Sequence, residues 1–143
     1  IPLAVGNINL GDAFILIGAY MLGAYAIIAC PLGASLCDLI SGYTIYAPAT
    51  FVIKALMVVC VILVLKLFNK INKGQKLALV ISAILAEIIM VLGYLIYELF
   101  LYGGSAFANV PFNLIQAVIN VVIATILFIL LTKLKIFENY VDK

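Results

Sequence analysis

The sequence predicts an all-α integral membrane protein. Of its 143 residues, 68% are hydrophobic and only 10% are charged, and the mean hydropathy is +1.35. These values are typical of chains whose helices face lipid. The apolar residues form long runs separated by short turns rich in glycine, proline and asparagine. We therefore expect one transmembrane domain over residues 1–143.

The apolar runs predict helical segments at about 12–30, 31–42, 49–69, 76–102 and 110–134. Residues 1–11 contain asparagines and glycines and are predicted to be a loop. Asp12 then opens the first helix, where an acid interacts favourably with the helix dipole, although a ligand role for Asp12 is equally open. Gly18, Ala19 and Gly23 should let another helix approach closely.

Pro31 suits the first turn of a helix, so we expect the second segment to begin there. At 1.5 Å per residue this segment would be roughly 18 Å long, too short to cross a hydrocarbon core of about 30 Å. The turn SGYTIYAP that follows should therefore end inside the protein near one membrane face. Irregular backbone is tolerated there only where other helices cover it or where it lines a cavity.

The lysines predict the orientation. All eight basic residues are lysines, and all but Lys54 lie around NKINKGQK or in the C-terminal tail. The positive-inside rule places both patches in the cytoplasm. The N-terminal loop, the SGYTIYAP turn and the YGGSAFANVP turn then face outward.

Composition also excludes several functions. The chain has no histidine or arginine and no basic stripe with interleaved aromatics, so we expect no nucleic-acid partner. The three cysteines lack metal-ligand spacing, and we expect no metal and no cofactor. No G-x-x-x-x-G-K-[ST] loop is present, so ATP hydrolysis would have to come from a partner. Asp12 and Asp38 could be imagined as a protease dyad, but the flanking motifs are missing, and the chain is predicted not to be an enzyme.

Polar residues within the spans point to a site. Glu87, Tyr94 and Glu98, separated by seven and four residues, lie on one helix face. Asn113, Gln116 and Asn120 form a second stripe. In the predicted topology nearly all such residues except Glu87 fall in the outer half of the membrane, which predicts a pocket open to the outside. The predicted substrate-binding residues are Asn7, Asn9, Asp38, Tyr43, Tyr46, Thr50, Lys54, Tyr94, Glu98, Asn113 and Gln116.

Other roles are open for these residues. Any of them could instead hydrogen-bond a neighbouring helix. Lys54 could be a structural ion-pair partner of Asp38 or Glu98, since a lone cation in lipid is costly. Glu87 lies deeper and is predicted to be a structural hydrogen-bonding group or a helix contact. The intramembrane acids outnumber the one cation, which favours a neutral or cationic heterocycle as ligand over a polyanion.

Five pieces of the sequence, in this order, resemble the substrate-binding S component of energy-coupling factor (ECF) vitamin transporters. They are NINLGD at 7–12, the small-residue helix after it, GASLCDLISGYTIYAPATFVIKAL at 33–56, AEIIMVLGYLIYE at 86–98 and VPFNLIQAVIN at 110–120. The resemblance implies a six-helix, multi-pass protein in the lipid of a prokaryotic cell membrane. The family's first helix, which carries a docking motif for the coupling subunit, would precede Ile1 and is absent from this sequence.

The same resemblance implies a function. Such a subunit captures a water-soluble vitamin or precursor from outside, here a riboflavin-, pyridoxine- or thiamine-precursor-like heterocycle. It then docks on a transmembrane coupling subunit driven by two ATP-binding cassette ATPases, as part of an ABC importer. The alternative is a stand-alone secondary carrier for a small polar metabolite, although the chain lacks the pseudo-symmetric pair of broken helices typical of such carriers.

Overall fold

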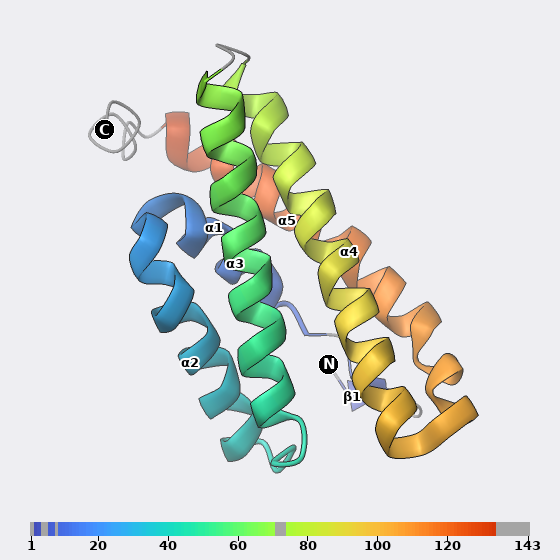
Figure 1. Ribbon diagram of the computed structural model, residues 1–143. Coiled ribbons are helices and arrows are strands. Elements are labelled where there is room, and N and C mark those ends of the chain that lie inside the picture. Colours follow the sequence, from blue (N-terminus) through green and yellow to red (C-terminus); the bar gives the residue numbers. More distant parts are fainter. Residues whose placement is uncertain (1, 4–5, 8, 71–73, 134–143) are drawn as a thin grey trace.

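The computed structural model describes residues 2–3, 6–7, 9–70 and 74–133 (Figure 1). The described residues form five α-helices, which confirms the all-α membrane fold: α1 (Gly11–Leu22), α2 (Ala26–Ile40), α3 (Ala47–Lys70), α4 (Gln75–Tyr102) and α5 (Val110–Lys133). Two 3-10 helices, η1 (Gly23–Tyr25) and η2 (Gly103–Ala108), join α1 to α2 and α4 to α5. A short antiparallel pair, β1 (Pro2–Leu3) and β2 (Gly6–Asn7), precedes them where a loop was predicted.

Four stretches of the described chain are long and apolar enough to cross a membrane. They are Gly11–Ile40, Ala47–Lys70, Lys76–Ala108 and Val110–Thr132. Many of their outward side chains are large and apolar, as in Phe100, which is 87% exposed, and Ile40, which is 86% exposed. Such surfaces are stable only against lipid or another apolar partner. The chain is therefore a multi-pass membrane protein.

The break between the first two helices differs from the prediction. We expected it at Cys30 and Pro31, but it lies at Gly23–Tyr25, and Pro31 is inside α2. Gly23 ends α1 with a positive φ of 54°, a conformation that glycine adopts without steric cost. Pro31 removes one hydrogen bond of α2 but is fully buried against its neighbours. At 12 and 15 residues, α1 and α2 are about 18 and 22 Å long, each shorter than a hydrocarbon core.

Small residues bring the helices together, as predicted for Gly18. A Cβ atom on Gly18 would lie 2.6 Å from Cys30 Sγ, so glycine is what lets α2 fold back against α1. Gly93 does the same between α3 and α4, since a Cβ atom there would lie 2.8 Å from Ile53 Cγ1. The core beneath these contacts includes Leu16, Met57 and Met90, all fully buried.

The arrangement of α3 and α4 determines where the polar residues of the predicted site lie. The two helices lie side by side near the turn that joins them and diverge toward their other ends (Figure 1). α2 packs against α3, α5 packs against α4, and α1 contacts α2, α3 and α5. Lys66, Lys70 and Lys76 lie at the α3–α4 turn, where α5 also ends. The polar residues of the predicted site lie toward the opposite ends of these helices.

Candidate functional site

Polar side chains from all five helices converge away from the lysine-bearing end. They form two groups. The first, called here the buried network, contains Asn9, Asp12, Lys54, Gln116 and Asn120. The second, called here the tyrosine cluster, contains Asp38, Tyr46, Thr50, Tyr94, Tyr97 and Glu98.

An ion pair lies at the centre of the buried network. Lys54 Nζ is 2.5 Å from Asp12 Oδ1, and the two side chains are 1% and 0% exposed. The predicted structural partners of Lys54 were Asp38 or Glu98, and that prediction was wrong. Asp12 replaces them because α1 packs directly on α3, and its first turn brings the carboxylate to the depth of Lys54. A buried charge without such a partner would be strongly destabilising.

Gln116 and Asn120 join α5 to the start of α1. Gln116 Nε2 donates to Asp12 Oδ2 at 2.8 Å, and its Oε1 accepts from the backbone N–H of Asn9, also at 2.8 Å. Asn120 Nδ2 donates to the carbonyl of Asn9 at 2.9 Å, and its Oδ1 accepts from the backbone N–H of Ala13 at 3.1 Å. Asn120 therefore satisfies the N–H of Ala13, one of the groups that a helix start leaves unpaired, and both amides bond the backbone of Asn9 just before the helix.

This contact explains how α1 begins without its own cap. The residue before the helix is Leu10, whose side chain cannot accept a hydrogen bond. Asn9 Oδ1 accepts from the N–H of Gly11 at 2.7 Å, and Asn120, from a distant helix, accepts from Ala13. The position of α1, and with it Asp12, thus depends on α5.

The tyrosine cluster links α2, α3 and α4. Thr50 Oγ1 donates to Asp38 Oδ2 at 2.5 Å and lies 2.9 Å from the hydroxyl of Tyr94. The ring centroid of Tyr46 lies 6.4 Å from that of Tyr94 and 5.9 Å from that of Tyr97. The hydroxyl of Tyr97 donates to the carbonyl of Ile45, so α4 holds the 41–46 turn. The three tyrosine rings therefore pack next to one another, and each carries a hydroxyl group.

Glu98 contacts this group of rings through Tyr46. Its Oε1 accepts from the hydroxyl of Tyr46 at 3.3 Å, while its Oε2 is buried and has no hydrogen-bond partner within the described part of the chain. Burial above all, with help from neighbouring Tyr102 and the negative charge of Glu98, raises the pKa of Tyr46. Tyr46 therefore remains a protonated donor at neutral pH, and Glu98 keeps one oxygen for another donor.

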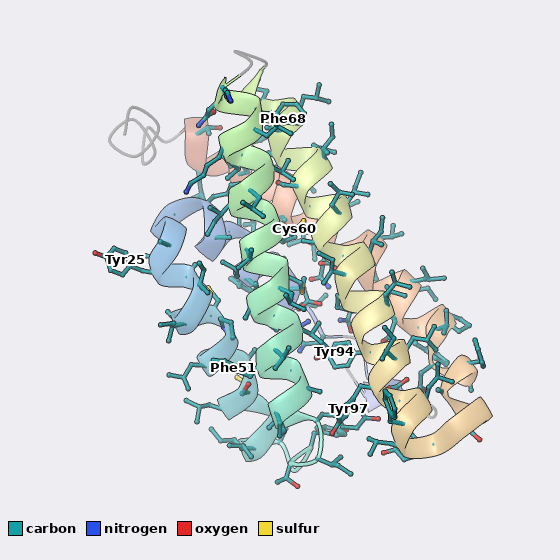
Figure 2. The ribbon with its side chains drawn as sticks, in the orientation of Figure 1. Tyr25, Phe51, Cys60, Phe68, Tyr94 and Tyr97 are labelled. Atoms are coloured by element: carbon teal, nitrogen blue, oxygen red, sulfur yellow. The ribbon has the colours of Figure 1, made fainter. Side chains whose placement is uncertain are left out.

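Lys54 connects the two groups. Its Nζ lies 5.1 Å from the ring centroid of Tyr94, within the range of a cation–π interaction. Tyr94 and Tyr97 both come from α4 and lie where α3 and α4 diverge (Figure 2). Tyr94 therefore joins the tyrosine cluster to the Asp12–Lys54 ion pair.

The structure brings together most of the predicted site residues. Asn9, Asp38, Tyr46, Thr50, Lys54, Tyr94, Glu98 and Gln116 all take part in the contacts above. Asn113 is half-buried, one turn before Gln116 on α5, and Tyr43 is 45% exposed in the 41–46 turn. Asn7 belongs to β2, and its side chain lies outside the described residues. The contacts are established, but ligand binding by these residues stays a prediction.

The site residues that the sequence did not predict are those whose role depends on a contact with a distant part of the chain. Asp12, Tyr97 and Asn120 were not placed in the predicted site. A signal was present for two of them, since Asp12 is an acid at the start of an apolar run and Asn120 is an amide within one. The predicted depth in the membrane is the same for Asp12, Asp38 and Glu98. It therefore could not show which of these acids pairs with Lys54.

One of the two predictions for Glu87 was wrong. It is not a structural hydrogen-bonding group, since neither carboxyl oxygen has a hydrogen-bond partner among the described residues, whereas the predicted helix contact is not contradicted. The side chain is 2% exposed and interacts electrostatically with Asp12 and Lys54. It therefore lies beside the buried network without being bonded to it.

An apolar helical bundle with polar and aromatic groups gathered at one end is the architecture of a membrane protein that binds a small molecule. The comparisons with known proteins agree. A family model described as "ECF-type riboflavin transporter, S component" matches residues 1–133, and the chain belongs to this family. It is thus a vitamin-binding S component of a transport system.

One curated relative is from Pyrococcus woesei and is described as "Uncharacterized protein in gap 3'region". The two chains are 35% identical over 127 residues, which cover 86% of this chain and 80% of the relative. No solved structure matches the chain.

Proposed function

We propose that this protein captures riboflavin from outside the cell at the tyrosine cluster and delivers it to an ATP-driven coupling module. The coupling module would consist of a transmembrane coupling subunit and two ATP-binding cassette ATPases, because the chain has no nucleotide-binding loop of its own. Family membership supports the proposal, and the chemistry of the cluster is what recommends riboflavin as the vitamin.

Riboflavin has three parts with different needs. Its flat tricyclic ring favours aromatic neighbours, which Tyr46, Tyr94 and Tyr97 supply. Its pyrimidine edge alternates carbonyl acceptors with an N–H donor, and its ribityl chain carries hydroxyl groups. The hydroxyl protons of Thr50 and Tyr94 are already engaged, by Asp38 and by Thr50 respectively, so these oxygens can only accept, and they suit the hydroxyl groups of the ribityl chain. The amide of Asn113 can donate to a carbonyl of the pyrimidine edge.

The observation that carries the proposal is Oε2 of Glu98, which has no hydrogen-bond partner among the described residues, although the side chain of Asn109 also interacts with this carboxyl group. A buried carboxylate oxygen without a donor is costly, so a ligand that brings an N–H group gains from the contact. The ring N–H of riboflavin is such a donor. A ligand that offers only acceptors would instead be repelled from Glu98.

Charge favours riboflavin over its phosphorylated forms. Lys54 is the only buried cation among the described residues, and Asp12 already neutralises it. A phosphate group in this site would have no cation to pair with and would lie near Asp38 and Glu98. We therefore expect neutral riboflavin to bind at least about a hundredfold more tightly than flavin mononucleotide, equivalent to ~2.7 kcal/mol. Titration of the purified protein followed by flavin fluorescence measures both affinities, and equal affinities would contradict the proposed site.

Two substitutions test the residues directly. Glu98→Gln should weaken riboflavin binding about tenfold, because it removes the charge from the hydrogen bond to the ring N–H. Asn113→Ala should weaken binding by a similar factor through loss of an amide contact. Calorimetry measures both. Thr125→Ala is the control on α5, since the Thr125 hydroxyl bonds only its own helix, at Val121 O. Affinities within about twofold of wild type in both site variants would remove these residues from the site.

Transport distinguishes the proposal from a stand-alone carrier. In liposomes, the protein alone should bind riboflavin tightly but move little of it across the membrane. Adding the coupling subunit, the ATPases and ATP should produce accumulation. Rapid riboflavin exchange by the protein alone would favour the carrier, whereas failure to bind any flavin would refute the substrate and leave the family assignment intact.

A further inference from the structure

Glu87, in the middle of α4, is a buried carboxyl group for which the proposed binding site has no role. Its carboxyl group is among the most deeply buried polar groups described, at 2% exposure. Neither Oε1 nor Oε2 accepts a hydrogen bond within the described residues. Glu87 lies two helical turns below Tyr94 and takes no part in the proposed contacts with riboflavin.

The charged and titratable groups around Glu87 can be assigned helix by helix. Asp12 interacts with it from α1 and Lys54 from α3. Tyr94, on α4 itself, interacts with the same pair. The polar groups that α5 contributes to this region, Gln116 and Asn120, are uncharged amides. Asp38 of α2 interacts with Tyr94 and is engaged by Thr50. The centre therefore has one cation and two carboxyl groups.

The contacts of the two carboxyl groups differ. Asp12 has the ammonium group of Lys54 on one oxygen and the amide N–H of Gln116 on the other. Glu87 has no donor on either oxygen among the described residues. An ionised carboxylate without a donor, deep in a membrane protein, carries a large energetic cost. A bound proton removes this cost and makes the centre electrically neutral.

We propose that Glu87 is a proton-binding site that holds its proton at neutral pH, and that loss of this proton destabilises the docking of α1 on α3. The consequence follows from the charge count. Once Glu87 is ionised, Lys54 faces two carboxylates and can pair fully with only one. Attraction toward Glu87 weakens the pair with Asp12, and that pair is the contact that fixes the first turn of α1 to α3. This inference does not depend on the identity of the vitamin.

Infrared spectroscopy of the full chain in lipid tests the proton directly. A protonated carboxyl group in an apolar site absorbs above the amide I band and shifts in heavy water. We expect such a band at neutral pH, its loss in Glu87→Gln, and its retention in Asp38→Asn, the control, whose carboxyl group accepts a hydrogen bond from Thr50. A spectrum of Glu87→Gln that keeps the wild-type band would overturn the proposal.

Thermal melts across pH test the linkage. A carboxyl group that holds its proton more tightly in the folded than in the unfolded chain makes stability fall as pH rises, until the folded state has also lost the proton. Wild type should therefore melt at progressively lower temperature from mildly acidic to alkaline pH, and Glu87→Gln, which stays neutral, should lack this component. If Glu87→Gln does not fold, loss of the wild-type infrared band at alkaline pH, together with the fall in melting temperature, supports the proposal. A wild-type protein without either change would overturn it.

Discussion

Replacement of Lys54 by methionine is expected to lower the free energy of unfolding by about 3–5 kcal/mol, the usual cost of removing one partner from a buried ion pair. Methionine retains most of the side-chain volume, so the loss is electrostatic rather than a cavity. The carboxyl group of Asp12, which is 0% exposed, would keep the hydrogen bond from the neutral amide of Gln116 but would have no cation beside it among the described residues. A thermal or denaturant melt in detergent, without ligand, measures the change.

A reciprocal substitution provides the control for Lys54. The double variant Asp12→Asn with Lys54→Met removes both charges and should recover most of the lost stability, because neither charge is left uncompensated. Lys66→Met, on the same helix but exposed at the opposite end, should change stability by no more than about 0.5 kcal/mol. If Lys54→Met and the double variant were equally unstable, the ion pair would not be the source of the effect.

A further variant, Lys54→Ala, tests whether Lys54 also binds the ligand. A structural role alone predicts that Lys54→Ala lowers thermal stability but leaves riboflavin affinity intact. A ligand contact predicts loss of affinity as well, even at temperatures where the variant is fully folded. Calorimetry below the melting transition separates the two outcomes.

Substitution of Asn120 by leucine is expected to be the next most damaging change. It removes the acceptor for the N–H of Ala13 and the donor to the carbonyl of Asn9. Each buried backbone group left unpaired costs about 1–3 kcal/mol. Because both groups lie at the start of α1, we expect hydrogen exchange to increase in α1 more than in α3 or α4. Mass spectrometry of exchanged peptides resolves the three helices.

Asn113→Leu is the matched control for Asn120. It places the same substitution on the same helix stripe, but Asn113 is only half-buried and does not bond the start of α1. Exchange in α1 should therefore stay near the wild-type rate. An equal increase in both variants would mean that Asn120 acts through general packing of α5 and not through the helix start.

Much of this protein can be predicted from local sequence. The helical spans, the lysine-rich end and the polar stripes on α4 and α5 depend on composition and on the 3.6-residue period, both of which are local properties. The convergence of Tyr94, Glu98 and Gln116 at one depth followed from counting residues along each helix. The position of the break between α1 and α2 could not be predicted in this way. Pro31 and Gly23 are both residues that can end a helix, and only the folded structure shows that the break lies at Gly23.

By itself, the sequence determined that this chain crosses a membrane, which end carries the lysines and which side chains share a depth, because hydropathy and helical period act over short distances. Only the tertiary structure decided that Lys54 pairs with Asp12, that Asn120 completes the start of α1 and that Glu87 has no donor within the described part of the chain. The physical reason is that several acids and amides at one depth are equivalent in a one-dimensional sequence. They become different only when the packing of α1 against α3 and α5 brings particular atoms within hydrogen-bond distance.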